Sequence, residues 1–138
     1  MNDTVQFPYK TMLDASGASA LRPFVPIHFM ANGHQIDKIG LLDSGADVNV
    51  LPYPVGVALG LEWQNLKQLS GLSGNLGQYE SRAVALTAQV TPFDPIRLMF
   101  AWTRAENIPL ILGQVNFFLE YDVCFFRARA IFEVSPKV

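Results

Sequence analysis

The stretch Leu41-Leu42-Asp43-Ser44-Gly45-Ala46-Asp47 places a carboxylate at the end of an apolar run and follows it with a hydroxyl, a glycine and a small residue. Asp and Ser bond nearby backbone amides and Gly accepts positive φ, so the pattern predicts a strand that ends in a tight turn. Two carboxylates that face each other can share a proton, one acting as general base on a water and the other as general acid. The chain contains one Asp-Ser-Gly, so a second such carboxylate would come from another copy of the chain.

Composition and charge limit the classes of protein to consider. The chain has 138 residues, 50% of them hydrophobic and 16% charged, which suits one globular domain with a sizeable core. A net charge of −2 with scattered basic residues provides no stripe for nucleic acid and no polybasic patch for a membrane. Without a signal peptide or a span-length apolar window, a cytoplasmic protein is predicted. The single cysteine, Cys124, forms no intrachain disulfide and is expected to be a buried strand thiol.

Short apolar runs rich in Val, Ile and Phe, separated by Gly, Pro and Asn, predict an all-β protein. Asn32-Gly33 lies between two such runs and is the strongest short signal for a hairpin. Residues 1–20 are expected to form an N-terminal extension and residues 21–138 a single domain. The predicted strands cover residues 21–30, 35–42, 48–51, 67–72, 78–90, 96–102, 109–113, 121–126 and 130–134. A short helix is predicted over residues 114–120, and a poorer one over residues 55–61 because that segment holds two glycines.

Two later segments give the Asp43 turn its context. Taken alone, Asp-Ser-Gly is more typical of an ordinary turn than of a catalytic site. Further along the chain a second apolar strand, containing Ile111 and Leu112, ends at Gly113. Between the two strands, the glycine-rich residues 71–78 are predicted to form a hairpin, which suits a mobile lid and an ordinary exposed hairpin equally well.

The order of these parts resembles the retroviral-type aspartic proteases, the retropepsin-like family, in a cellular or bacterial form. The resemblance rests on the string from Leu41 to Val48, the hairpin over residues 71–78 and the string Ile111-Leu112-Gly113. Arg22-Pro23, near the first predicted strand, also fits the family. The resemblance implies an all-β, closed β-barrel or sandwich with a flap hairpin and one short helix near the C-terminus. It also implies an aspartic endopeptidase that works as a homodimer on peptide or protein substrates.

The resemblance assigns a role to each site residue. Asp43 would be the catalytic carboxylate, paired across a two-fold axis with Asp43 of a second chain, and Ser44 and Gly45 would support the active-site loop. The residues that would bind substrate are Gly45, Ala46, Asp47, Val48, Val50 and Ile111. The flap would consist of Gly71, Leu72, Ser73, Gly74, Asn75, Leu76 and Gly77. The family's chemistry needs no metal and no organic cofactor.

One residue departs from the family pattern. The retroviral members carry an arginine after the glycine of the second string, and it pairs with the second Asp of the active-site string. This chain has Gln114 there, so Asp47 needs another partner, with Arg22 and Arg104 as the candidates.

Two other functions fit the same residues. The first is a catalytically silent retropepsin-like module that dimerises or grips extended peptides without cleaving them. The second is a β-barrel that holds a small apolar ligand and in which the acidic turn is incidental.

Overall fold

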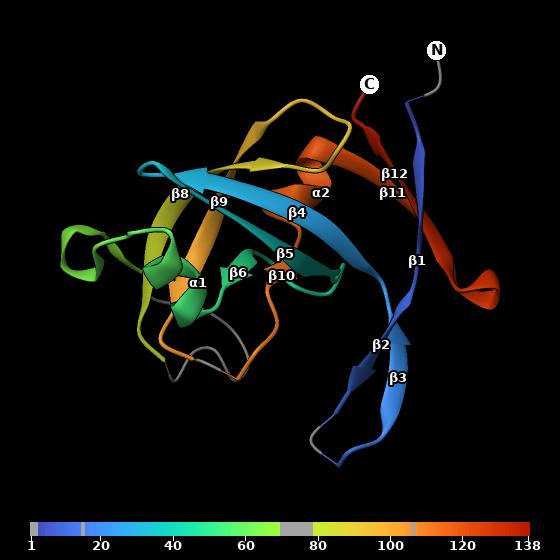
Figure 1. Cartoon of the computed structure of the whole chain (residues 1–138), viewed down its shortest axis with the longest axis horizontal. Helices are drawn as coiled ribbons and strands as arrows, with labels where there is room; N and C mark the ends of the chain where they lie inside the picture. The colour runs from blue at the N-terminus through green and yellow to red at the C-terminus, as the bar shows by residue number, and fades with distance from the viewer. Residues whose placement is uncertain (1–2, 15, 70–78, 106) are drawn as a thin grey trace.

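The computed structural model describes residues 3–14, 16–69, 79–105 and 107–138, and its centre is a closed β-barrel (Figure 1). Neighbouring strands around the barrel follow the order β4, β5, β10, β6, β9 and β8, and a pairing between β4 and β8 closes the ring. Their bounds are β4 Phe24–Ala31, β5 His34–Leu42, β6 Asn49–Leu51, β8 Ser81–Gln89, β9 Ile96–Thr103 and β10 Ile111–Leu112. A short strand, β7 (Gln68–Leu69), pairs antiparallel with the first two residues of β8. The predicted all-β architecture is confirmed.

The hairpin predicted at Asn32-Gly33 joins β4 to β5. The pairing is continuous from Phe24 opposite Leu41 to Ala31 opposite His34. Asn32 and Gly33 both have positive φ, 53° and 77°, which is the backbone that a two-residue hairpin turn requires and that Asn and Gly tolerate best. The long hairpin therefore fixes the position of the end of β5 and, with it, the position of Asp43, which follows β5 directly.

Within the described residues, two short α-helices cover parts of the barrel. The first, α1 (Tyr53–Ala58), packs near β9, where Tyr53 stacks on Trp102 with ring centroids 5.4 Å apart. The second, α2 (Phe117–Glu120), begins three residues later than the predicted helix and ends at the predicted residue. Single turns of 3₁₀ helix occupy Trp63–Asn65 and Arg127–Arg129. No helix in the described part of the chain is long enough and apolar enough to cross a membrane.

A second sheet joins the two ends of the chain. Strand β12 (Ile131–Pro136) lies between β1 (Val5–Pro8) and β11 (Tyr121–Phe126), and all pairings are antiparallel. The N- and C-terminal segments therefore run side by side (Figure 1). Cys124, in β11, is exposed, contrary to the expectation of a buried thiol, because its side chain alternates onto the outer face of this sheet.

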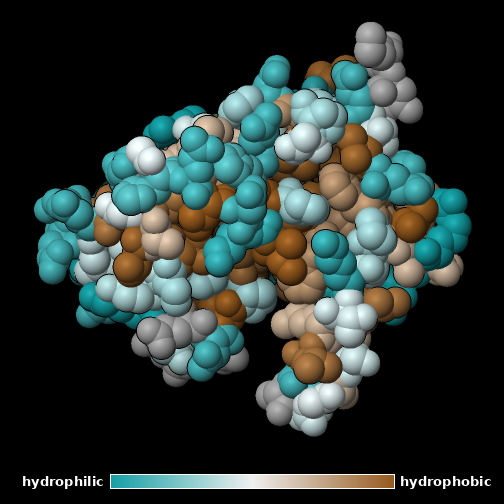
Figure 2. All heavy atoms as spheres, in the orientation of Figure 1, coloured by the Kyte–Doolittle hydropathy of each residue, from teal (hydrophilic) through white to brown (hydrophobic). Residues whose placement is uncertain are grey.

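A separate hairpin of β2 (Lys10–Leu13) and β3 (Ser19–Arg22) projects from the barrel. Leu13 is 67% exposed and Leu21 is 37% exposed, and apolar atoms are visible on the surface of this hairpin (Figure 2). The strand predicted over residues 21–30 is interrupted between β3 and β4 at Pro23, which has no N–H to continue a ladder. The hairpin thus carries apolar surface that the barrel does not cover.

Candidate active site

Asp43 directly follows β5 and is held by hydrogen bonds on both sides of its turn. Its backbone N–H donates to the carbonyl of Leu112 at 3.0 Å, because β10 runs parallel to β5 with Leu112 opposite Leu42. The N–H of Gly45 donates to Asp43 Oδ1 at 3.0 Å, and the N–H of Ala46 donates to the Asp43 carbonyl at 3.1 Å. The half-buried carboxylate is thereby fixed through Oδ1, and Oδ2 has no hydrogen-bond partner within the described residues.

The segment after β10 passes directly against the loop that carries Asp43. The N–H of Gln114 donates to the carbonyl of Ala46 and the N–H of Val115 donates to the carbonyl of Asp47, both at 2.9 Å. A Cβ on Gly113 would lie 2.7 Å from the Ala46 carbonyl oxygen and still closer to that of Val48, so only glycine fits here. The segment from Leu41 to Val48 and the segment from Ile111 to Gly113, which carried the family resemblance, are therefore side by side in the structure.

Gln114 supports the loop at the position where the family pattern has arginine. Its Nε2 donates to the carbonyl of Ser44 at 2.8 Å. The ion pairs among the described residues do not involve Asp47, which is exposed. The guanidinium of Arg104 instead lies over the rings of Tyr53 and Trp63, 4.5 and 4.3 Å from their centroids. At this position a neutral amide therefore bonds the backbone of the loop at Ser44 and leaves the Asp47 carboxylate without an ion pair among the described residues.

The other predicted site residues differ in exposure. Ser44 and Gly45 are exposed, while Ala46 and Val48 are half-buried. Ile111 is half-buried opposite Val50, which is 1% exposed and forms part of the core rather than an open wall. The predicted flap residues 71–77 lie outside the described residues.

Asn49, a fully buried polar residue next to the loop, was not among the residues predicted from the sequence. Its Oδ1 accepts the N–H of Gly113 at 2.8 Å, and its Nδ2 donates to the carbonyl of Met99 at 2.9 Å and to Oδ1 of Asn116 at 3.2 Å. Asn49 therefore ties β6, β9 and the end of β10 together. A polar residue inside the apolar run from Val48 to Leu51 was the available signal, because buried polar side chains are nearly always hydrogen-bonded.

Replacement of Asn49 with Ala should lower the free energy of unfolding by about 3 kcal/mol, since this buried side chain loses three hydrogen bonds at about 1 kcal/mol each. Urea unfolding followed by circular dichroism measures the change. The matched control is Asn65→Ala, where the amide is exposed and bonds the exposed Glu62, and its effect should be about 0.5 kcal/mol or less. Equal effects of the two substitutions would contradict a structural role for Asn49.

His28, the histidine in β4, already has partners for both ring nitrogens. Nδ1 lies 2.7 Å from Asp37 Oδ1 and Nε2 lies 2.9 Å from Gln35 Oε1, both across the β4–β5 hairpin. The hydrogen bond to the Asp37 carboxylate raises the pKa of His28. Among the described residues no three His, Cys, Asp or Glu side chains are grouped to hold a metal ion.

The chain is similar in structure to a retropepsin-like aspartic protease from Rickettsia conorii. The TM-score is 0.60, the sequence identity is 14%, and the match covers 95% of this chain and 90% of that chain. No protein-family model and no curated protein matches the chain. At this identity the similarity defines the fold, and the fold is retropepsin-like, as the motifs predicted.

Proposed function

We propose that this chain is an aspartic endopeptidase that hydrolyses peptide bonds in extended peptides, with Asp43 as its catalytic carboxylate. The observation that carries the proposal is the Asp43 turn, in which Gly45 fixes Oδ1 and Oδ2 is left for a second group. This turn lies on a retropepsin-like barrel, and the structurally similar chain from Rickettsia conorii is an aspartic protease. The loop is also backed by the segment after β10, as a rigid catalytic loop requires.

The proposed enzyme is a homodimer because one chain contributes one such turn. Two Asp43 carboxylates about 3 Å apart across a two-fold axis cannot both ionise, so together they retain one proton. The ionised carboxylate takes a proton from water, which attacks the peptide carbonyl carbon, and the protonated carboxylate donates to the carbonyl oxygen. Val115, which bonds the Asp47 carbonyl, is 47% exposed, and Leu119 in α2 is 60% exposed, so both would supply apolar surface for a partner subunit.

Substrate would bind as an extended strand over the loop. Ser44 would brace the loop of the facing subunit, and Gly45, Ala46 and Asp47 would bond the substrate backbone. Val48 and Ile111, both half-buried, would contribute apolar pocket walls, with Val50 packed behind them. The hairpin over residues 71–77 is proposed as the flap that covers the bound peptide.

Activity should depend on protein concentration, because each subunit supplies half of the site. Below the dissociation constant of the dimer, the initial rate should rise with the square of the chain concentration, and above it the rate should rise linearly. Cleavage rates across a dilution series, read alongside sedimentation equilibrium, test this dependence. A linear rate throughout a range in which the chain sediments as a monomer would refute a shared site.

A silent dimerisation or peptide-binding module is the second candidate. One observation favours it: Asp47 has no ion-pair partner among the described residues, so the substrate side of the loop lacks the brace seen in the family pattern. Incubation of the chain with a peptide library from acidic to neutral pH, followed by mass spectrometry, separates the two candidates. The protease should generate new termini that an active-site aspartic protease inhibitor suppresses, and the silent module should generate none.

A further inference from the structure

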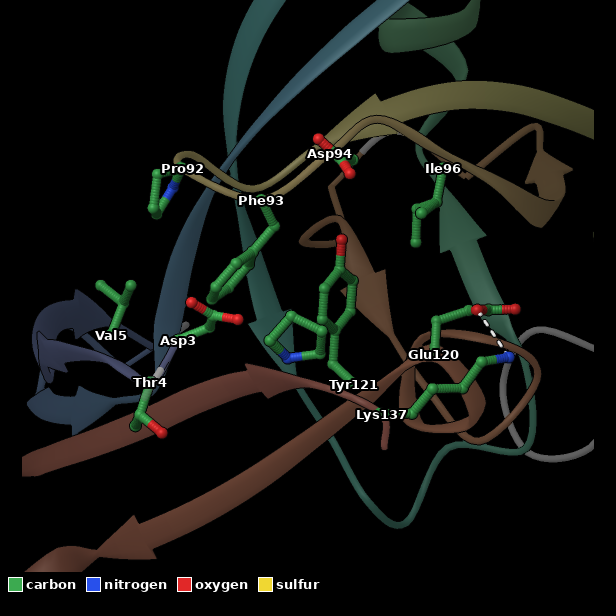
Figure 3. Close-up of a pocket in the computed structure, with 11 residues that line it drawn as sticks. Asp3, Thr4, Val5, Pro92, Phe93, Asp94, Ile96, Glu120, Tyr121 and Lys137 are labelled. Carbon is green, nitrogen blue, oxygen red and sulfur yellow. Dashed lines mark ion pairs between the residues drawn. The ribbon is translucent and has the colours of Figure 1, made fainter. Parts of the chain in front are cut away.

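A cavity of about 620 Å³ lies outside the candidate active site, where both ends of the chain meet the turn between β8 and β9 (Figure 3). Its volume is in the range of small-ligand sites. Phe93 and Ile96 line it from the β8–β9 turn and the start of β9, and Tyr121 lines it from the start of β11. None of its described lining residues belongs to the Asp43 loop or to the segment that backs it.

Tyr121 brings a buried hydroxyl to this cavity. The residue is 3% exposed, and its ring packs on Phe117 and Phe93 with centroids 4.9 and 5.7 Å away. Its Oη is buried and has no hydrogen-bond partner among the described residues. Figure 3 shows the hydroxyl end of the ring directed toward Asp94. An unsatisfied buried hydroxyl costs about 1–3 kcal/mol, so a partner that enters the cavity would recover free energy.

The hydroxyl remains protonated at neutral pH. Burial raises the pKa of Tyr121 to about 12, and the negative charges of Glu120 and Asp94 act in the same direction. The neutral hydroxyl can therefore both donate and accept a hydrogen bond, and it can accept one from a cation.

The charges around the cavity are mainly negative. Asp3, Asp94 and Glu120 line it together with one basic residue, Lys137, whose Nζ lies 3.0 Å from Glu120 Oε2 (Figure 3). Asp3 and Asp94 take part in no ion pair within the described ranges. Because these carboxylates do not group closely enough to hold a metal ion, the negative charge favours an organic cation.

We propose that this cavity binds an aliphatic chain ending in an ammonium or guanidinium group. The aliphatic part lies against Phe93 and Ile96, and the charged end lies between Asp94 and the Tyr121 hydroxyl. Such a ligand is either a free alkyl amine or a lysine or arginine side chain of a peptide, since both present the same chemistry. The inference does not rest on protease activity.

Three probes with the same carbon chain and different charges test the ligand class. Pentylamine, 1-pentanol and pentanoate are titrated into the protein while the ring signals of Tyr121 and Phe93 are followed by NMR. Pentylamine should bind, 1-pentanol should bind at least about fivefold more weakly, and pentanoate should not bind. Equal binding of all three, or no binding of pentylamine, would overturn the proposal.

A capped tripeptide, acetyl-Gly-Lys-Gly-amide, distinguishes the two sources of the cation. Binding of the peptide at least as tight as that of pentylamine supports the proposal with a peptide side chain as ligand. Binding of pentylamine alone supports it with a small free amine as ligand.

Variants locate the bound cation. Asp94→Asn should weaken pentylamine binding about tenfold, because it removes the charge from one hydrogen-bond partner, and Tyr121→Phe should weaken it about threefold to tenfold. The control is Asp122→Asn, which removes the same charge from the exposed residue next to Tyr121 and outside the cavity, and which should leave binding unchanged. Asp94 is exposed in a turn, so its replacement should not disturb folding. Unchanged binding in both cavity variants, or an equal loss in Asp122→Asn, would overturn the proposed site.

Discussion

Replacement of Asp43 with Asn is expected to leave the fold intact and to lower the rate of peptide cleavage by roughly 10²–10⁴-fold. Asn keeps an oxygen that can accept the N–H of Gly45, so the turn should survive. It cannot take a proton from water at any working pH, so the proposed dyad loses its base. The kcat of a purified sample on a cleavable peptide and its thermal unfolding curve measure the two effects separately.

The matched control for Asp43→Asn is Asp122→Asn, the same chemical change on the exposed face of β11. It should leave kcat within about twofold of the parent, because the residue lies outside the proposed site. An Asp43→Asn protein that cleaves as fast as the parent would show that Asp43 is not the catalyst.

Mixed dimers extend the Asp43 test to the two-fold symmetry. If both carboxylates are required, an excess of the Asp43→Asn chain should draw parent chains into dimers with one carboxylate and reduce their activity. The residual rate should then follow the fraction of dimers with two parent chains. A rate that depends only on the amount of parent chain would instead indicate that each subunit acts alone.

The sequence predicted the parts of the fold that short-range patterns determine. Asn32-Gly33 specified the β4–β5 hairpin because few residues tolerate its backbone, and that hairpin positions Asp43. The string ending at Gly113 was found beside the Asp43 loop, although the two are far apart in the chain. Local propensity alone cannot choose the partner of a strand, and before the structure only the family resemblance linked these two segments.

The features that were missed depend on contacts distant in sequence. Strand β1 lies in a segment of mixed composition and exists through its pairing with β12 at the other end of the chain. Asn49 looked like one more residue of a short strand, and its role emerges only when Gly113, Met99 and Asn116 surround it. In the sequence, Gln114 indicated only that Asp47 lacks the arginine partner of the family pattern. In the structure, the side-chain amide of Gln114 donates a hydrogen bond to the carbonyl of Ser44 in the Asp43 loop.

Gly113→Ala should be the most destabilising substitution at the candidate site, lowering the free energy of unfolding by about 3 kcal/mol or more. The added methyl group would lie 2.7 Å from the Ala46 carbonyl oxygen and still closer to that of Val48, and both atoms belong to the backbone. The loop cannot move away without breaking the bonds from Gln114 and Val115 that hold it. A loss of about 3 kcal/mol is a substantial part of the stability of an average domain, which is about 5–15 kcal/mol.

Gly45→Ala is the control that separates this steric effect from a general intolerance of the Asp43 loop to any glycine-to-alanine substitution. Its Cβ would meet only the side-chain Oδ1 of Asp43, at 3.3 Å, and the backbone φ of Gly45 is not in the left-handed region. We therefore expect a stability change of about 1 kcal/mol or less for Gly45→Ala. Thermal and urea unfolding of both variants measure the difference, and a Gly113→Ala protein as stable as Gly45→Ala would show that the two segments are not packed against each other. A large difference would mean that the Asp43 turn is set by a glycine seventy positions away, at a contact where the backbone of one segment passes directly against the loop that follows another strand.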